Sequence, residues 1–82
     1  MAAGKELIEL IAKKLVDHPE EVNVRVIERE DGDQFELRVH PDDMGKVIGK
    51  EGRTAKAIRT LLGSTAAKAG TQADLTIVDE ED

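Results

Sequence analysis

The stretch GKVIGKEGR at residues 45–53 sets two glycines, Gly49 and Gly52, on either side of the polar pair Lys50 and Glu51. Because glycine has no Cβ, a loop built in this way lets the backbone come close to a ligand. We expect a helix to begin at this loop, so that its free N–H groups and the positive end of its dipole point toward the loop. Phosphate is the usual occupant of such a position.

Positive charge gathers around this loop, although the chain as a whole is acidic. The 82 residues have a formal net charge of −6, yet residues 45–70 contain six basic residues and one acidic residue. A basic segment in an acidic body favours local phosphate binding with little indiscriminate binding of polyanions. The alternative is a solvated helix face that pairs with the acidic body. The basic residues nearest the loop are Lys46, Lys50 and Arg53, followed along the helix by Lys56 and Arg59.

The hydropathy pattern on both sides of the loop predicts three helices and three strands. Apolar residues recur with helical spacing over residues 5–16, and they alternate with polar ones on both sides of an Asp-Gly turn at residues 30–33. Three strands do not cover themselves, so we expect the helices on one face of the sheet in an α+β two-layer fold. The predicted order is a helix over 5–16, strands from Val22 and from Phe35 to Val39, a short helix capped by Asp42 or Asp43, a long helix from about Arg53 to Gly70, and a strand over 73–77.

Composition excludes several classes of site. Phe35 is the one residue among Phe, Tyr and Trp, which argues against nucleic-acid binding by stacking of bases on aromatic rings. The absence of cysteine excludes disulfides, Cys-based zinc sites and thiol catalysis. His18 and His40 stand alone without metal-ligand spacing, so we expect no metal and no cofactor.

Length and hydropathy indicate one domain over residues 1–82, with a core at about 5–78 and an acidic tail at 79–82. No stretch approaches the roughly 18 apolar residues of a membrane helix, so no membrane insertion is expected. The N-terminus is too charged for a signal peptide. These features favour a cytoplasmic protein.

The loop and the order of elements together carry a family resemblance. An Ile-Gly-x-x-Gly loop between two helices, after a strand hairpin and before a last strand, resembles the KH domain. The order α-β-β-α-α-β is similar to the type II arrangement, which implies a three-stranded mixed sheet. The stretch GKVIGKEGRTAKAIRTLL at residues 45–62 resembles the small, free-standing KH domains of the bacterial KhpA (YlqC-type) family. The resemblance covers nearly the whole chain.

This resemblance implies binding of single-stranded RNA at the loop. Gly49, Lys50, Glu51 and Gly52 would hold the sugar-phosphate backbone, and Ile48 would floor a groove for the bases. Members of the family act as homodimers or as heterodimers with a KH protein of the KhpB (Jag) type. They are linked to small-RNA handling, which implies post-transcriptional regulation or RNA chaperoning, and in some bacteria to cell shape and envelope growth.

Two residues depart from the general KH pattern. Glu51 places an acidic side chain within the phosphate loop, which is expected to weaken backbone contact. Ala55 stands where many KH domains have a larger aliphatic residue. Both departures favour weak binding by one isolated domain. The RNA contacts are therefore predicted at Lys46, Ile48, Gly49, Lys50, Glu51, Gly52, Arg53 and Lys56.

The long helix also suggests an interface. Its inner side is predicted to carry Ala57, Ile58, Leu61, Leu62, Thr65 and Ala69. Small or apolar residues at neighbouring positions would leave a surface open to a second helix. The alternative is an alanine-rich helix selected for propensity alone. The candidate dimer residues are Ala55, Leu62, Ala66 and Ala67.

Two functions remain on the sequence alone. The favoured one is a non-catalytic module that binds single-stranded RNA as a dimer. The alternative is a protein-interaction subunit that recruits a second KH protein and makes only minor contact with RNA, which the acidic net charge and Glu51 favour. No nucleophile–base pair, metal-ligand cluster or Walker-type lysine is present, so neither an enzyme nor a small-molecule substrate is expected.

Overall fold

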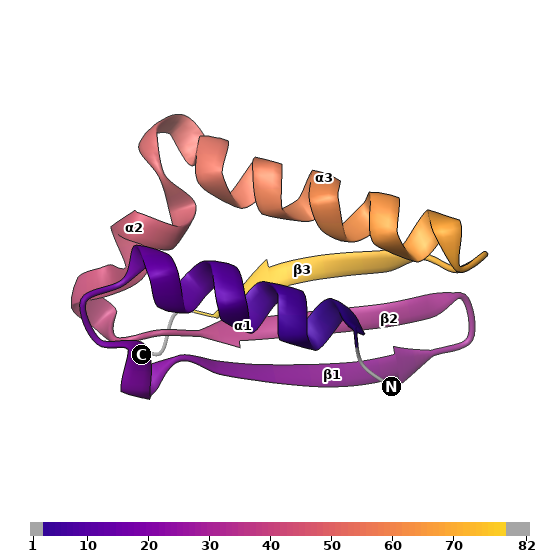
Figure 1. Cartoon of the computed structure of the whole chain (residues 1–82), viewed down its shortest axis with the longest axis horizontal. Helices are drawn as coiled ribbons and strands as arrows, with labels where there is room; N and C mark the ends of the chain where they lie inside the picture. The colour runs from indigo at the N-terminus through magenta and orange to yellow at the C-terminus, as the bar shows by residue number, and fades with distance from the viewer. Residues whose placement is uncertain (1–2, 79–82) are drawn as a thin grey trace.

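The helices of the computed structural model, which describes residues 3–78, cover one face of a three-stranded sheet (Figure 1). The elements are α1 (Ala3–Leu15), β1 (Asn23–Arg29), β2 (Gly32–Arg38), α2 (Met44–Ile48), α3 (Arg53–Lys68) and β3 (Ala73–Ile77). This order confirms the predicted α-β-β-α-α-β arrangement. Three single 3₁₀ turns lie in the connections, at Pro19–Glu21, Pro41–Asp43 and Lys50–Gly52.

The sheet is mixed, as the fold resemblance implies. Its strand order is β1-β2-β3. β1 and β2 pair antiparallel with Val26 opposite Phe35, and β2 and β3 pair parallel with Phe35 opposite Leu75. The crossover from β2 to the parallel β3 runs through α2 and α3, because parallel neighbours need a long connection.

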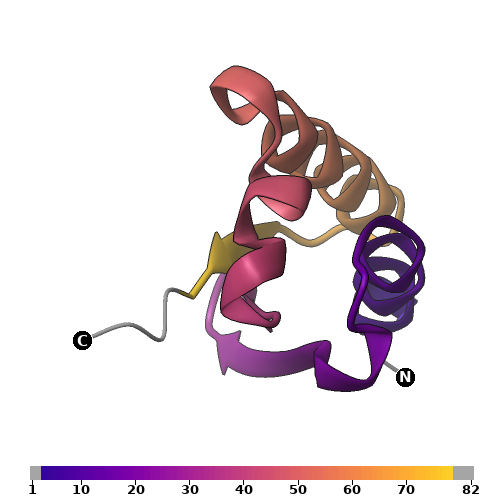
Figure 2. The same cartoon turned by 90° about the vertical axis from the view of Figure 1, so that its left-hand side faces the viewer.

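The core lies between the sheet and the pair α1 and α3, which run side by side above it (Figure 2). Phe35 is 3% exposed at the centre of the sheet. The side chains of Ile8 from α1 and Leu62 from α3 close over the sheet. The largest fully buried side chains are Ile8, Leu37, Asp43, Val47, Leu62 and Leu75.

The inner side of α3 differs from the prediction. Its buried residues are Ala55, Ile58, Leu62 and Ala66, so Ile58 and Leu62 are confirmed. Small side chains, Ala55 and Ala66, occupy two of these four inner positions. The predicted inner residues Ala57, Leu61, Thr65 and Ala69 are instead exposed.

The same burial corrects the candidate dimer surface. Ala55, Leu62 and Ala66 are 5%, 1% and 8% exposed within a single copy of the chain. The expectation that they form an open surface is therefore wrong, because they already pack against the chain's own core. Ala67 alone of the four is exposed.

The end of α3 follows the predicted stop at Gly70. Gly70 has φ 76°, its N–H donates to the carbonyl of Ala67, and the N–H of Thr71 donates to the carbonyl of Ala66. These two bonds make a Schellman end, which needs a residue in the left-handed region. Within residues 3–78, no helix is long and apolar enough to cross a membrane. The acidic tail expected at 79–82 lies outside the described residues.

Candidate nucleic-acid interface

The loop of residues 49–52, called the glycine loop below, joins α2 to α3 and stands away from the sheet at one end of the molecule (Figures 1 and 2). Gly49 has φ 78° and ψ 171°, and Gly52 has φ 75°. A Cβ on Gly49 would overlap the hydroxyl and backbone nitrogen of Thr54. Glycine is thus required at position 49 by both its dihedral angles and the space around it.

Glu51 adopts a left-handed conformation inside this loop, with φ 57° and ψ 25°. A residue with a Cβ adopts this region at a cost of about 1–2 kcal/mol, so the loop holds a strained turn between its two glycines. The side chain of Glu51 is 70% exposed and lies 3.5 Å from a terminal nitrogen of Arg53. The predicted acid of the loop therefore pairs with one of the predicted phosphate-binding cations.

The N-terminus of α3 opens directly onto the loop. Its N-cap residue, Gly52, provides no side-chain hydrogen bond. The 3₁₀ turn Lys50–Gly52 leads directly into α3, and the N–H of Arg53 donates to the carbonyl of Lys50. No side chain of the described residues caps the first turn of the helix. Together with the helix dipole, this uncapped end makes a positive backbone surface beside the loop.

The predicted basic residues fall into four groups. Lys50 and Lys56 are exposed and make no ion pair within residues 3–78. Arg53 is 80% exposed and, in the part of the chain that the structure describes, pairs only with the exposed Glu51. Lys46 pairs with two carboxylates of its own chain. Arg59, further along α3, donates from Nε to the carbonyl oxygen of Leu75 over 3.0 Å.

Apolar surface lies beside the loop at the end of α2. Ile48 is 37% exposed and directly precedes Gly49, whereas its neighbour Val47 is fully buried in the core. α2 thus turns one aliphatic side chain inward and leaves the next one open next to the loop. The contact with a base that the family resemblance implies for Ile48 stays a prediction.

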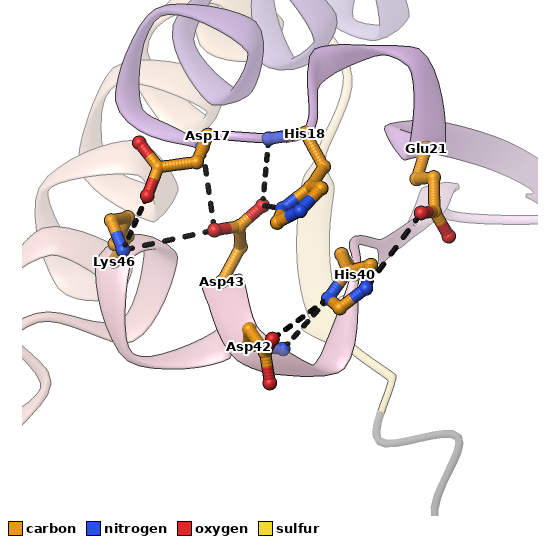
Figure 3. Close-up of polar contacts among 7 residues, drawn as sticks. All are labelled: Asp17, His18, Glu21, His40, Asp42, Asp43 and Lys46. Atoms are coloured by element: carbon orange, nitrogen blue, oxygen red, sulfur yellow. Dashed lines mark hydrogen bonds and ion pairs between the residues drawn. The ribbon is translucent and has the colours of Figure 1, made fainter.

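A buried carboxylate at the base of α2 was not predicted. Asp43 is 0% exposed, and its carboxylate accepts hydrogen bonds from the N–H groups of Asp17 (3.3 Å) and His18 (3.0 Å) and from His18 Nδ1 (3.0 Å) (Figure 3). Lys46 Nζ lies 3.7 Å from Asp43 Oδ1 and 3.2 Å from Asp17 Oδ2. The carboxylate therefore ties the start of α2 to the chain that leaves α1.

The two histidines lie together although they are far apart in the sequence. The rings of His18 and His40 stack with centroids 4.0 Å apart and an interplanar angle of 14° (Figure 3). His40 Nδ1 accepts the N–H of Asp42 over 3.0 Å and so caps the turn Pro41–Asp43. Of the two predicted caps, Asp42 or Asp43, Asp43 occupies the N-cap position of α2, but no side chain makes the expected cap bond there, and the Asp43 carboxylate turns toward His18.

These contacts shift the pKa values of three side chains. The hydrogen bond to Asp43 is the largest cause that raises the pKa of His18 above its usual 6.5, against an opposing effect of burial. Burial raises the pKa of Asp43, but the hydrogen bonds from His18 and from backbone N–H groups outweigh it and lower the pKa below 3.8. The pKa of Lys46 is raised, first by its contact with Asp17 and then by Asp43.

Comparison with known proteins places this fold and loop in a family. The family model described as "KhpA/KhpB, KH domain" matches residues 5–77. The chain belongs to this family. The resemblance drawn from residues 45–62 is thereby confirmed. This KH domain contains both the glycine loop and the group of Asp17, His18, Asp43 and Lys46, called the Asp43 cluster below.

Curated relatives match over nearly their full length. The protein named RNA-binding protein KhpA from Halalkalibacterium halodurans is 54% identical over 77 residues, which cover 92% of this chain and 99% of that protein. The protein of the same name from Borreliella burgdorferi is 54% identical and covers 90% of each chain. The one from Clostridium perfringens is 58% identical over 78% of this chain and 85% of its own.

A solved structure supports the fold alone. The crystal structure of an Era variant from Aquifex aeolicus bound to GDP·AlF4⁻ matches with a TM-score of 0.67 at 20% identity. The match covers 90% of this KH domain but only 29% of that chain. The likeness therefore indicates a shared fold with one part of a larger protein.

Proposed function

We propose that this KH domain binds single-stranded RNA at the glycine loop and performs no catalysis. The observation that carries the proposal is the uncapped start of α3 beside a strained glycine loop, flanked by Lys50 and Lys56, which make no ion pair in the described chain. Backbone N–H groups and free ammonium groups are the usual ligands of a phosphate. Relatives at 47–58% identity carry the name RNA-binding protein.

The RNA backbone would pass over the glycine loop, and Ile48 would contact a base beside it. One KH domain covers about four nucleotides. Such a short site binds weakly, so we propose that the domain works in pairs, either with a second copy or with a KH protein of the KhpB (Jag) type. Joining two modules raises affinity through effective concentration. Its cellular role would be post-transcriptional regulation or RNA chaperoning.

Exposed leucines favour a second candidate, a subunit that chiefly recruits a partner protein. Leu10 on α1 is 55% exposed and Leu61 on α3 is 52% exposed. Exposed apolar side chains are common in protein interfaces. In this case α1 and α3 would contact the partner, and RNA would contribute little to binding.

Fluorescence anisotropy with a labelled 12-nucleotide oligouridine separates the two candidates. The variant Lys50→Asp changes the charge at the loop, and its matched control Lys68→Asp makes the same charge change at the far end of α3. RNA binding at the loop predicts a loss of affinity and a shallower salt dependence for Lys50→Asp, with little change for Lys68→Asp. Equal losses, or no binding by the unchanged chain, would contradict the proposal and favour partner recruitment.

A further inference from the structure

Two cations converge on the single charge of Asp43. Its Oδ2 atom accepts one hydrogen bond from the backbone N–H of His18 and one from Nδ1 of the same residue, each over 3.0 Å. Its Oδ1 atom faces Lys46 Nζ at 3.7 Å. The imidazole of His18 and the ammonium of Lys46 therefore share one buried carboxylate, with the imidazole at Oδ2 and the ammonium at Oδ1 (Figure 3).

Lys46 stands between this carboxylate and the glycine loop along the chain. It belongs to α2, the five-residue helix that ends at Ile48 and leads directly into Gly49. Its side chain is 44% exposed, so solvent and RNA can reach it. Its other partner, Asp17, is 72% exposed, and water and salt screen that contact strongly. Asp17 is the nearer carboxylate, at 3.2 Å, and the larger cause of the raised pKa of Lys46, but the buried Asp43 is the less screened of the two counter-ions.

We propose that Asp43 is a positioning residue for RNA binding, whose charge is shared by His18 and Lys46, so that a proton on His18 releases Lys46 toward RNA phosphate. When His18 is charged, the imidazolium neutralises the carboxylate. When His18 is neutral, the ring still donates a hydrogen bond through Nδ1, but Lys46 is left as the balancing cation. The inference rests on the proposed function, because it assigns a pH dependence to the same RNA site.

The surroundings of His18 support this competition. The raised pKa of His18 and the lowered pKa of Asp43 both follow from their mutual hydrogen bond. The charged and titratable groups around His18 are Asp17, Glu20 and Glu21 on its own connection, His40, Asp42 and Asp43 on the turn before α2, and Lys46 on α2.

RNA binding at two pH values tests the release of Lys46. Oligouridine with hydroxyl ends would be titrated at pH 5.5 and pH 8.5, at one ionic strength, with Lys46→Gln and with the matched neutral variant Lys50→Gln. Lys46→Gln is expected to weaken binding about threefold at pH 5.5, the size of one exposed ionic contact, and to leave it unchanged at pH 8.5. Lys50→Gln should weaken binding equally at both. With His18→Gln as the background, the effect of Lys46→Gln should no longer depend on pH.

A titration without RNA tests the shared charge by itself. If both cations use Asp43, removing Lys46 must raise the pKa of His18, because linkage between the two sites is reciprocal. NMR of the imidazole should therefore show a higher pKa for His18 in Lys46→Gln and no change in Lys50→Gln.

The two measurements separate the failures. A raised pKa of His18 in Lys46→Gln without RNA binding by any chain would overturn the proposed function and leave the competition for Asp43 intact. RNA binding in which Lys46→Gln has the same effect at both pH values, or an unchanged pKa of His18 in that variant, would overturn the inference.

Discussion

The guanidinium of Arg59 donates from Nε to the carbonyl oxygen of Leu75 over 3.0 Å, so that α3 caps a backbone group of β3. Among the described strands β3 pairs with β2 alone, so its other edge has no strand partner there. The N–H of Leu75 is taken in the same way, by the carboxylate of Asp74 over 2.8 Å. Side chains of the domain thus satisfy both groups of Leu75, and this protects the strand edge against pairing with another chain.

Replacing Arg59 by methionine is expected to destabilise the domain. The change keeps the aliphatic contact but removes the donor, which leaves the carbonyl of Leu75 without its partner and costs about 0.5–1.5 kcal/mol. The free energy of unfolding would be measured in urea. Lys56→Met on the same helix is the control, since Lys56 makes no ion pair in the described chain. Equal stability of the two variants would show that the capping bond contributes nothing.

Gly49→Ala is expected to cost about 2 kcal/mol or more of stability. The new Cβ meets the side chain and backbone of Thr54, and φ 78° is unfavourable for alanine. Gly63→Ala is the matched change in the middle of α3, where no atom lies within 4 Å of an added Cβ. That variant should be stabilised by about 0.5–1 kcal/mol through helix propensity. Urea unfolding would measure the stability of both variants. An unchanged free energy of unfolding in Gly49→Ala would contradict the assigned loop geometry.

The sequence predicted the elements and the loop well, because hydropathy period and glycine placement are local signals. It predicted the inner face of α3 poorly. Ala57, Leu61 and Ala69 were predicted to face inward, whereas the buried side of the helix is formed by Ala55, Ile58, Leu62 and Ala66. Which side of a helix faces the core depends on residues far apart in the sequence, and no local pattern records it.

The Asp43 cluster could not be predicted for a related reason. His18 and Asp43 are 25 residues apart, and each has an ordinary local explanation, as a helix end and as a helix cap. Only the fold brings the connection after α1 against the turn before α2. The sequence carries one signal at these positions, because each histidine is followed by a proline that restricts its backbone. This signal does not indicate which residue the histidine contacts.

Glu51→Gln is expected to raise the affinity for RNA about two- to fivefold. The change removes the negative charge from the glycine loop and frees Arg53, now 3.5 Å from the carboxylate, for a phosphate. Anisotropy with oligouridine would measure the effect. Glu28→Gln, an exposed residue on β1, changes the net charge equally and serves as the control. The same gain in both variants would indicate an effect of net charge rather than of the loop.

The stability of the domain is expected to be greatest between about pH 3.8 and pH 6.5. The folded pKa of His18 is raised above 6.5, so its stabilising effect is complete below pH 6.5 and is lost as pH rises through the folded pKa. The folded pKa of Asp43 is lowered below 3.8, so its effect is present above pH 3.8 and is lost as pH falls through the folded pKa. Thermal midpoints across this range should fall on the alkaline side in the unchanged chain and in His40→Gln, and stay flat there in His18→Gln. An alkaline fall that persists in His18→Gln would overturn the assignment of this fall to His18.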